Sequence, residues 1–89
     1  DITSLRCFKS IYETRSMTKS SIIMGLSKAA LSKRVDGLES NLGFKLFTRT
    51  TRSLIPTAKA DQLILKVNDI LVRVDNLESE NDHHSDFVT

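Results

Sequence analysis

The sequence predicts a mainly α fold that contains one short β-hairpin and ends in a long helix. Apolar residues recur at helical spacing in four separate stretches of the chain. Between the third and fourth stretches, residues 46–57 change to β-branched and aromatic residues around a polar tip. The apolar face of the fourth stretch is longer than a domain formed by the preceding residues could cover.

The first helix is expected from about Ile2 to Thr14. Its apolar residues fall three or four positions apart and therefore share one face: Leu5, Phe8, Ile11 and Tyr12. Cys7 lies beside this face and is expected to be a small buried side chain rather than a redox-active thiol. Because it is the only cysteine, no internal disulfide can form.

A short second helix and a longer third helix are expected on either side of a tight turn. Ser16 and Thr18 are candidate N-caps of the second helix, and Gly25 is expected to end it because glycine tolerates a left-handed backbone. Ser27 would then cap the third helix, residues 28–42. The apolar residues of that helix step by four, three and four positions: Leu31, Val35, Leu38 and Leu42.

Residues 46–57 predict a two-stranded hairpin. Its tip reads Thr-Arg-Thr-Thr-Arg-Ser, and Pro56 excludes a continuing helix. The tip contains neither Asn-Gly nor Asp-Gly, so the sequence does not predict the turn type.

Thr57 is expected to cap a final helix of residues 58–80, with a polar and frayed tail at 81–89. Apolar residues spaced by four and three form a coiled-coil-like seam at 63–77, widened by neighbouring leucine and isoleucine residues. The preceding residues cannot cover this seam, so we expect a partner to pack on it, at Leu63, Val67, Ile70, Leu71, Val74 and Leu77. The predicted organisation is therefore a domain at 1–57, a long helix at 58–80 that needs a partner, and the tail.

The net charge of +2 is the sum of two unlike parts. Residues 1–60 hold 11 Lys/Arg and four Asp/Glu, whereas residues 61–89 hold two Lys/Arg and seven Asp/Glu. This asymmetry indicates that the first part faces a polyanion and that the second part has another task. We expect neither a membrane span nor a signal peptide, because the given sequence contains no sufficiently long apolar run and does not open with a charged region followed by one.

Two helices joined by a tight turn and followed by a hairpin make a winged helix-turn-helix, with a three-helix core and the hairpin as its wing. A helix that enters the DNA major groove needs small, polar and basic side chains near its N-terminus. Residues of these types follow the turn: Ser27, Lys28, Ala29, Ser32, Lys33 and Arg34. Arg49 and Arg52 supply the wing with cations for phosphates or the minor groove.

The sequence resembles the N-terminal domain of LysR-type transcriptional regulators. That family follows a pattern close to S-F-T-x-A-A, then S-Q-x-A-L-S-x-x-I-x-x-L-E-x-x-L-G-x-x-L-F-x-R, then T-x-x-G. The matching residues lie at 16–21, 27–49 and from Thr57 onward, and the resemblance covers about residues 2–80.

The resemblance implies a DNA-binding homodimer joined through the linker helix, in a cytoplasmic, nucleoid-associated regulator without enzymatic activity. It places Lys28, Ala29, Ser32 and Lys33 in the major groove. It also adds Thr18 near a phosphate and Thr50 beside Arg49 and Arg52 on the wing. Family members continue into an effector-binding domain that this sequence lacks. No cofactor is therefore expected in this chain, which would be a DNA-binding fragment or an unusually short regulator.

Three departures from the family pattern stand out. Ser20 and Ser21 replace Ala-Ala, and their hydroxyls are expected to loosen a packing surface. Lys28 replaces glutamine, which favours contact with guanine or phosphate over adenine. The pair at 59–60 is Lys-Ala where Ala-Gly is common.

The alternative function is a helical protein-interaction module that uses the 63–77 seam without binding DNA. The tail residues His83, His84, Ser85 and Asp86 contain the residue types of a hydrolase triad, but adjacent residues cannot adopt its geometry. The two histidines have no further ligands nearby for zinc.

Overall fold

The computed structural model contains four helices and one antiparallel hairpin. The elements are α1 (Ile2–Thr14), α2 (Met17–Met24), α3 (Lys28–Leu42), β1 (Phe47–Arg49), β2 (Leu54–Pro56) and α4 (Ala58–Val88). The structure describes the backbone of residues 1–88 and the side chains of residues 1–79. The mainly α winged helix-turn-helix fold is thereby confirmed.

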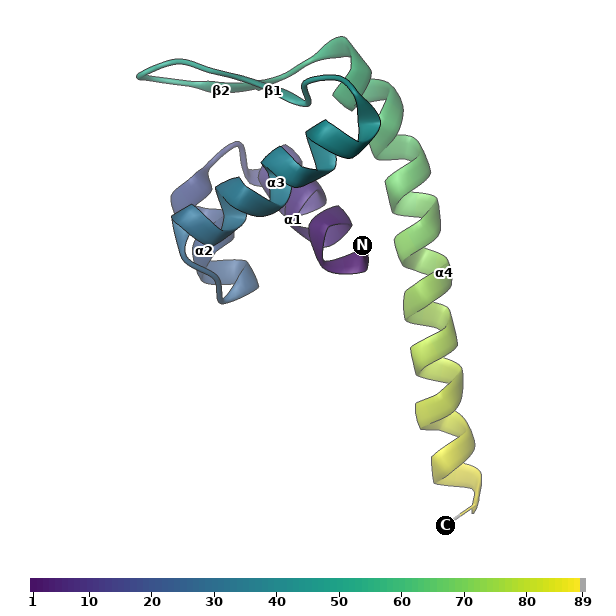
Figure 1. Cartoon of the computed structure of the whole chain (residues 1–89). Coiled ribbons are helices and arrows are strands. Elements are labelled where there is room, and N and C mark those ends of the chain that lie inside the picture. The colour runs from purple at the N-terminus through teal and green to yellow at the C-terminus, as the bar shows by residue number, and fades with distance from the viewer. Residues whose placement is uncertain (89) are drawn as a thin grey trace.

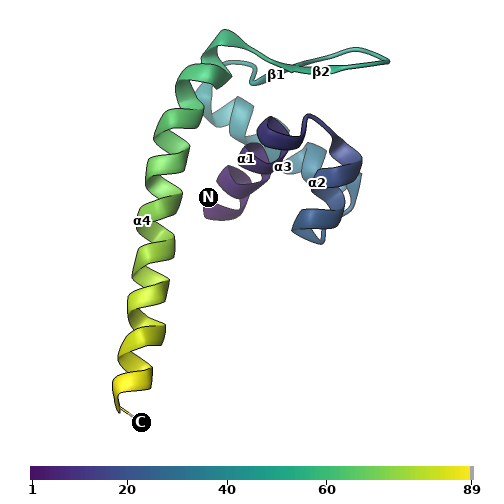
Figure 2. The same ribbon diagram turned by 180° about the vertical axis from the view of Figure 1, so that it is seen from behind.

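The first three helices gather beside the N-terminal half of α4, and the hairpin projects from the end at which α4 begins (Figure 1). Seen from behind, the C-terminal half of α4 again extends past the three-helix domain (Figure 2). The molecule is accordingly elongated, with principal extents of 53 × 25 × 19 Å.

The predicted caps at Ser16, Gly25 and Ser27 form, whereas the other candidate, Thr18, lies inside the first turn of α2 and is not its cap. Ser16 Oγ accepts the Lys19 backbone N–H at 3.1 Å, and Ser27 Oγ accepts the Ala30 N–H at 3.1 Å. Gly25 ends α2 with φ of 65°, a left-handed conformation that costs glycine little. The turn between α2 and α3 is therefore fixed by local chemistry that the sequence already contains.

The hairpin pairs its strands in the register Phe47↔Pro56, Thr48↔Ile55 and Arg49↔Leu54. Thr57 closes its base, because the Thr57 backbone N–H donates to the Leu46 carbonyl at 2.9 Å. The Thr57 hydroxyl also accepts the Ala60 N–H at 3.2 Å, so the predicted cap of α4 is confirmed.

The hydrophobic core is shared by α1, α3, the base of the hairpin and α4. Phe8 of α1 lies at its centre, with its ring 5.7 Å from the ring of Phe47. Cys7 is fully buried, as predicted, and burial raises the pKa of its thiol although the positive charge of Arg34 opposes this shift. The buried apolar residues are Cys7, Phe8, Ile11, Leu31, Val35, Leu38, Leu46, Phe47, Ala60, Ile64, Val67 and Leu71.

The prediction for the seam of α4 was wrong for two residues. Val67 and Leu71 are each only 1% exposed, and they pack into the core of their own chain together with Ala60 and Ile64. Two polar contacts hold α4 against α1, one from Tyr12 to Asp61 at 2.7 Å and one from Arg6 to Asp75 at 2.8 Å. An apolar period reveals that a helix face is buried, but it does not reveal which chain covers that face.

Helix α4 also continues to Val88, past the predicted end at Glu80. The chain contains neither glycine nor proline after Pro56, so no residue in this stretch forces the helix to end. The described backbone of residues 81–88 is therefore helical where a frayed tail was predicted. The side chains of that segment, including His83, His84 and Asp86, lie outside the described residues.

The expectation that Ser20 and Ser21 loosen the packing between α1 and α2 was also wrong. Ser20 is fully buried, and its hydroxyl lies 3.0 Å from Ser10 Oγ and 2.8 Å from Thr14 Oγ1. The Ser21 hydroxyl donates to the Leu26 carbonyl. Both hydroxyls are satisfied, because partners on α1 and in the turn replace the contacts that alanines would make.

Candidate nucleic-acid interface

Helix α3 presents a polar and cationic face opposite its buried face. Leu31, Val35 and Leu38 pack into the core, which turns the other side of the helix outward. Lys28, Ala29, Lys33 and Asp36 are exposed on that side and Ser32 is half-buried there: these five residues are hereafter called the α3 outer face. The residues predicted to enter the major groove are therefore brought together, with Arg34 as the exception.

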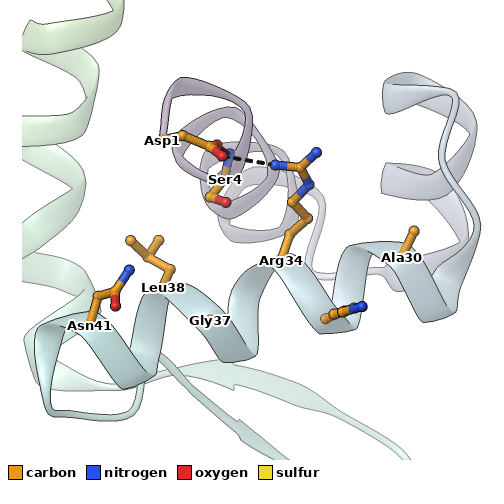
Figure 3. Close-up of a pocket in the computed structure, with 8 residues that line it drawn as sticks. Asp1, Ser4, Ala30, Arg34, Gly37, Leu38 and Asn41 are labelled. Atoms are coloured by element: carbon orange, nitrogen blue, oxygen red, sulfur yellow. Dashed lines mark hydrogen bonds and ion pairs between the residues drawn. The ribbon is translucent and has the colours of Figure 1, made fainter.

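Arg34 lies on a different side of α3. Its Nη1 donates to Asp1 Oδ2 at 3.0 Å, which links α3 to the N-terminus of α1. In Figure 3 the Arg34 side chain extends from α3 toward Asp1 and Ser4. Asp1 also caps α1, because its Oδ1 accepts the Ser4 backbone N–H at 2.8 Å. Asp1 therefore holds Arg34 toward α1 instead of letting it join the α3 outer face.

The two wing arginines differ in position. Arg49, at the end of β1, donates from Nη1 to Ser32 Oγ at 2.9 Å, and its Nη2 lies 3.8 Å from Asp36 Oδ1. Arg52 lies at the exposed tip of the hairpin. Arg49 thus contacts the α3 outer face, whereas Arg52 extends beyond it.

Thr50 shapes the tip of the wing. Its hydroxyl oxygen accepts the backbone N–H of Ser53 at 3.0 Å and that of Arg52 at 3.3 Å. The Thr50 backbone N–H donates to the Ser53 carbonyl at 2.9 Å. Thr18, the remaining predicted contact, is exposed in the first turn of α2, next to the cap at Ser16.

Glu39 fixes the wing to α3, a role that we did not predict from the sequence. Glu39 is only 8% exposed. Its carboxylate accepts the Leu46 backbone N–H at 2.7 Å and lies 3.6 Å from Lys45 Nζ. A carboxylate in the last turn of a helix opposes the helix dipole, so it needs compensating donors. The position of Glu39 near the C-terminal end of a predicted helix is therefore the sequence signal that could have indicated this contact.

The cations of the α3 outer face and wing tip are not neutralised within the domain. Among the side chains that the structure describes, Lys28, Lys33 and Arg52 make no ion pair. Asp36, the acid on the α3 outer face, lies against Arg49. The face therefore carries a net positive charge that is suited to an anionic ligand.

Neither a metal site nor a membrane-spanning helix is found among the residues described. No group of three or more His, Cys, Asp or Glu side chains lies close enough together there to hold a metal ion. No helix within that part of the chain is both long and apolar enough to cross a bilayer.

Comparison with known proteins identifies relatives of this chain. It is 34% identical over 76 residues to the HTH-type transcriptional regulator PgrR of Escherichia coli, covering 85% of this chain and 25% of the relative. It is 38% identical over 80 residues to the HTH-type transcriptional activator AllS of Salmonella paratyphi A, covering 90% of this chain and 26% of the relative. The chain thus spans about a quarter of the length of these relatives.

Solved structures with the same fold include full regulators and isolated domains. The BenM DNA-binding domain in complex with benA site 1 DNA superposes with a TM-score of 0.85 at 25% identity, covering 96% of both chains. Oxidised OxyR of Corynebacterium glutamicum gives a TM-score of 0.87 at 26% identity, covering 90% of this chain and 26% of OxyR.

The family model described as "Bacterial regulatory helix-turn-helix protein, lysR family" matches residues 2–61, from the start of α1 into the first turn of α4. The match includes the helix-turn-helix, the α3 outer face and the whole wing. The chain belongs to the lysR family of bacterial regulatory helix-turn-helix proteins.

Proposed function

We propose that this chain binds double-stranded DNA in a sequence-specific manner, as the DNA-reading part of a transcriptional regulator acting on the bacterial nucleoid. The α3 outer face enters the major groove in this proposal, and Arg52 approaches the backbone or the minor groove from the wing. The observation that carries the proposal is a set of cations on α3 and the adjoining wing that pair with no described acidic side chain: Lys28, Lys33 and Arg52.

The contacts divide into two kinds. Lys28 and Lys33 carry charges that bind phosphates or guanine N7 and O6, whereas Ala29 and Ser32 are small enough to let the helix approach the base edges. Thr18, in the first turn of α2, and Ser27, which caps α3, complete the edge of this surface near the phosphates. Arg34, which is paired with Asp1, and Thr50, which is bonded within the wing tip, contribute by fixing the positions of α3 and of the wing.

We further propose that two copies associate through α4. After Val67 and Leu71 are covered by their own domain, Ile70 remains 41% exposed and Leu77 61% exposed on the side of the helix that also bears Leu63 and Val74. These four residues are hereafter called the α4 strip. A second copy packed on the strip would place two α3 helices on one duplex and give a dyad-symmetric operator.

Selection of bound duplexes from a random pool tests this function. We expect the wild-type chain to enrich a dyad-symmetric motif, and we expect the double variant Lys28→Ala/Lys33→Ala to lose most of that binding. Lys66→Ala is the matched control, because Lys66 is an exposed cation on α4, away from the α3 outer face.

An unenriched pool would refute the proposal. If the wild-type chain enriches no sequence and still forms a dimer, the alternative remains: a helical interaction module without DNA binding. The double variant removes two cations and Lys66→Ala removes one, so a loss of binding free energy from Lys66→Ala of half or more of the loss from the double variant would instead indicate nonspecific attraction by net charge.

A further inference from the structure

Arg49 forms a bridge between the wing and the α3 outer face. Its Nη1 donates to Ser32 Oγ at 2.9 Å, and its Nη2 lies 3.8 Å from Asp36 Oδ1. Ser32 and Asp36 are four residues apart and therefore lie one above the other on the same side of α3. The Arg49 side chain is 39% exposed, so the bridge lies at the margin of the surface that faces DNA in the proposed function.

The direction of the hydrogen bond between Arg49 and Ser32 is fixed by chemistry. A guanidinium has only donors, so Ser32 Oγ must be the acceptor. A serine hydroxyl has one O–H and two lone pairs, and the guanidinium occupies one of these lone pairs. Within the described part of the chain, the Ser32 O–H itself has no acceptor.

A cation that donates to the hydroxyl oxygen makes that hydroxyl a stronger hydrogen-bond donor and a weaker acceptor. Hydrogen bonds in a chain polarise one another, so donation by the guanidinium strengthens the Ser32 O–H as a donor. The same donation weakens the remaining lone pair as an acceptor. Asp36 sits beside Arg49 and helps to hold the guanidinium over Ser32, although the oxygen-to-nitrogen distance of 3.8 Å is long for a hydrogen bond.

We propose that Arg49 is a positioning residue that makes Ser32 a hydrogen-bond donor, so that Ser32 selects against cytosine at the base that it faces. In the major groove, adenine and guanine present N7, guanine adds O6 and thymine presents O4, all of which are acceptors. Cytosine presents only its N4 amino donor. The inference rests on the proposed function, because it requires Ser32 to face a base.

The test compares base preferences instead of overall affinity. Wild type, Ser32→Ala, Arg49→Met and the double variant are each used to select duplexes from one random pool. We expect the wild-type motif to disfavour cytosine about tenfold at one position of each half-site, within the discrimination of a single base contact. Ser32→Ala and Arg49→Met should both remove this preference at the same position, and the double variant should add nothing further.

Two controls separate positioning from a general effect on folding or charge. Arg52→Met removes a cation from the wing tip and should lower overall affinity while leaving the bias against cytosine at the Ser32 position intact. Ser32→Thr keeps the hydroxyl and should retain the bias against cytosine. If Arg49→Met merely damaged the structure of the wing, it would weaken binding to all DNA sequences equally and leave the bias against cytosine unchanged.

The outcomes distinguish this inference from the function on which it rests. A wild-type motif whose base preference survives Arg49→Met, or changes at a position different from that altered by Ser32→Ala, overturns the inference alone. A wild-type chain that enriches no motif overturns the proposed function, and the inference falls with it.

Discussion

At the scale of single residues, buried hydroxyls join α1 to α2. Ser10 and Ser20 are buried, and Ser20 lies within hydrogen-bonding distance of both Ser10 and Thr14. Thr14 also donates to the Ser16 carbonyl and accepts the Ser16 N–H. The contact between the two helices therefore depends on a polar network as well as on apolar packing.

Ser20→Ala should lower the free energy of unfolding by about 1 kcal/mol, because the buried Ser10 hydroxyl loses its acceptor. Removing both hydroxyls in Ser10→Ala/Ser20→Ala should cost less than the sum of the two single changes. Urea unfolding followed by circular dichroism measures both values, with exposed Ser40→Ala as the control. Strict additivity would show that the two hydroxyls do not interact.

Tyr12 offers a spectroscopic test of the contact between α1 and α4. It is the only tyrosine in a chain without tryptophan. Its hydrogen bond to Asp61 is the main cause that raises the pKa of the phenol, with burial and the charge of Asp61 adding to the shift. The folded state therefore holds the phenolic proton more tightly than the unfolded state does.

Asp61→Asn should lower the pKa of Tyr12 toward its ordinary value of about 10. The contribution of this contact to stability should be fully present below that ordinary value and lost as the pH rises through the folded-state pKa. Ultraviolet absorbance of the phenolate measures the titration. Asp69→Asn, which removes an exposed carboxylate paired with Arg73 on α4, is the control. Identical midpoints in wild type and Asp61→Asn would contradict the assigned contact.

At the scale of elements, the wing is held to α3 at two places. Glu39 accepts the Leu46 N–H ahead of β1, and Arg49 contacts Ser32 and Asp36 from the end of β1. Phe47 packs between these two points on Phe8 in the core. A two-stranded hairpin is marginal on its own, so these contacts to α3 and the core set the angle of the wing.

Glu39→Ala should destabilise the fold by about 2 kcal/mol, because the Leu46 N–H loses a charged acceptor in a buried place. Glu39→Gln should cost less, since its amide oxygen can still accept that N–H. Urea unfolding of both variants measures the difference, and exposed Glu13→Ala is the control. Equal losses for alanine and glutamine would mean that the Leu46 contact contributes little.

The elements that could be predicted from the sequence are those fixed by neighbouring residues. Ser16, Gly25 and Ser27 mark the ends of α2 and the start of α3, because caps act within one helical turn. The contacts that could not be predicted are long-range. Neither the pairing of Arg34 with Asp1 nor the bridge from Arg49 to Ser32 follows from local periodicity, because each joins elements that only tertiary packing brings together.

At the scale of the whole molecule, the boundary between the positive and the acidic parts of the sequence coincides with the boundary between the three-helix domain and α4. The positive first part of the sequence forms the three-helix domain and wing, and the acidic second part forms α4 from its first turns onward. The sequence correctly predicted that α4 is longer than its domain. The division of its apolar residues between the core and the α4 strip could not be predicted, because it depends on the rotation of α4 against α1.

Ile70→Asp should shift the chain from dimer to monomer in sedimentation, because it places a charge on the α4 strip. Val72→Asp is a matched control: Val72 is 53% exposed, and it lies two residues further along and therefore on another side of the helix. The proposed interface predicts that Val72→Asp stays dimeric. An unchanged mass for Ile70→Asp, or dissociation by both variants, would contradict the assignment of the strip.

The salt dependence of DNA affinity, measured on the selected duplex, tests the central claim most directly. Neutralised phosphates release counterions, so the logarithm of the association constant should fall linearly with the logarithm of salt concentration. Lys33→Ala should reduce the steepness of that slope by about one, because one cation on the α3 outer face is lost. An affinity that does not change with salt, or a slope that Lys33→Ala leaves unaltered, would contradict the claim that α3 faces DNA.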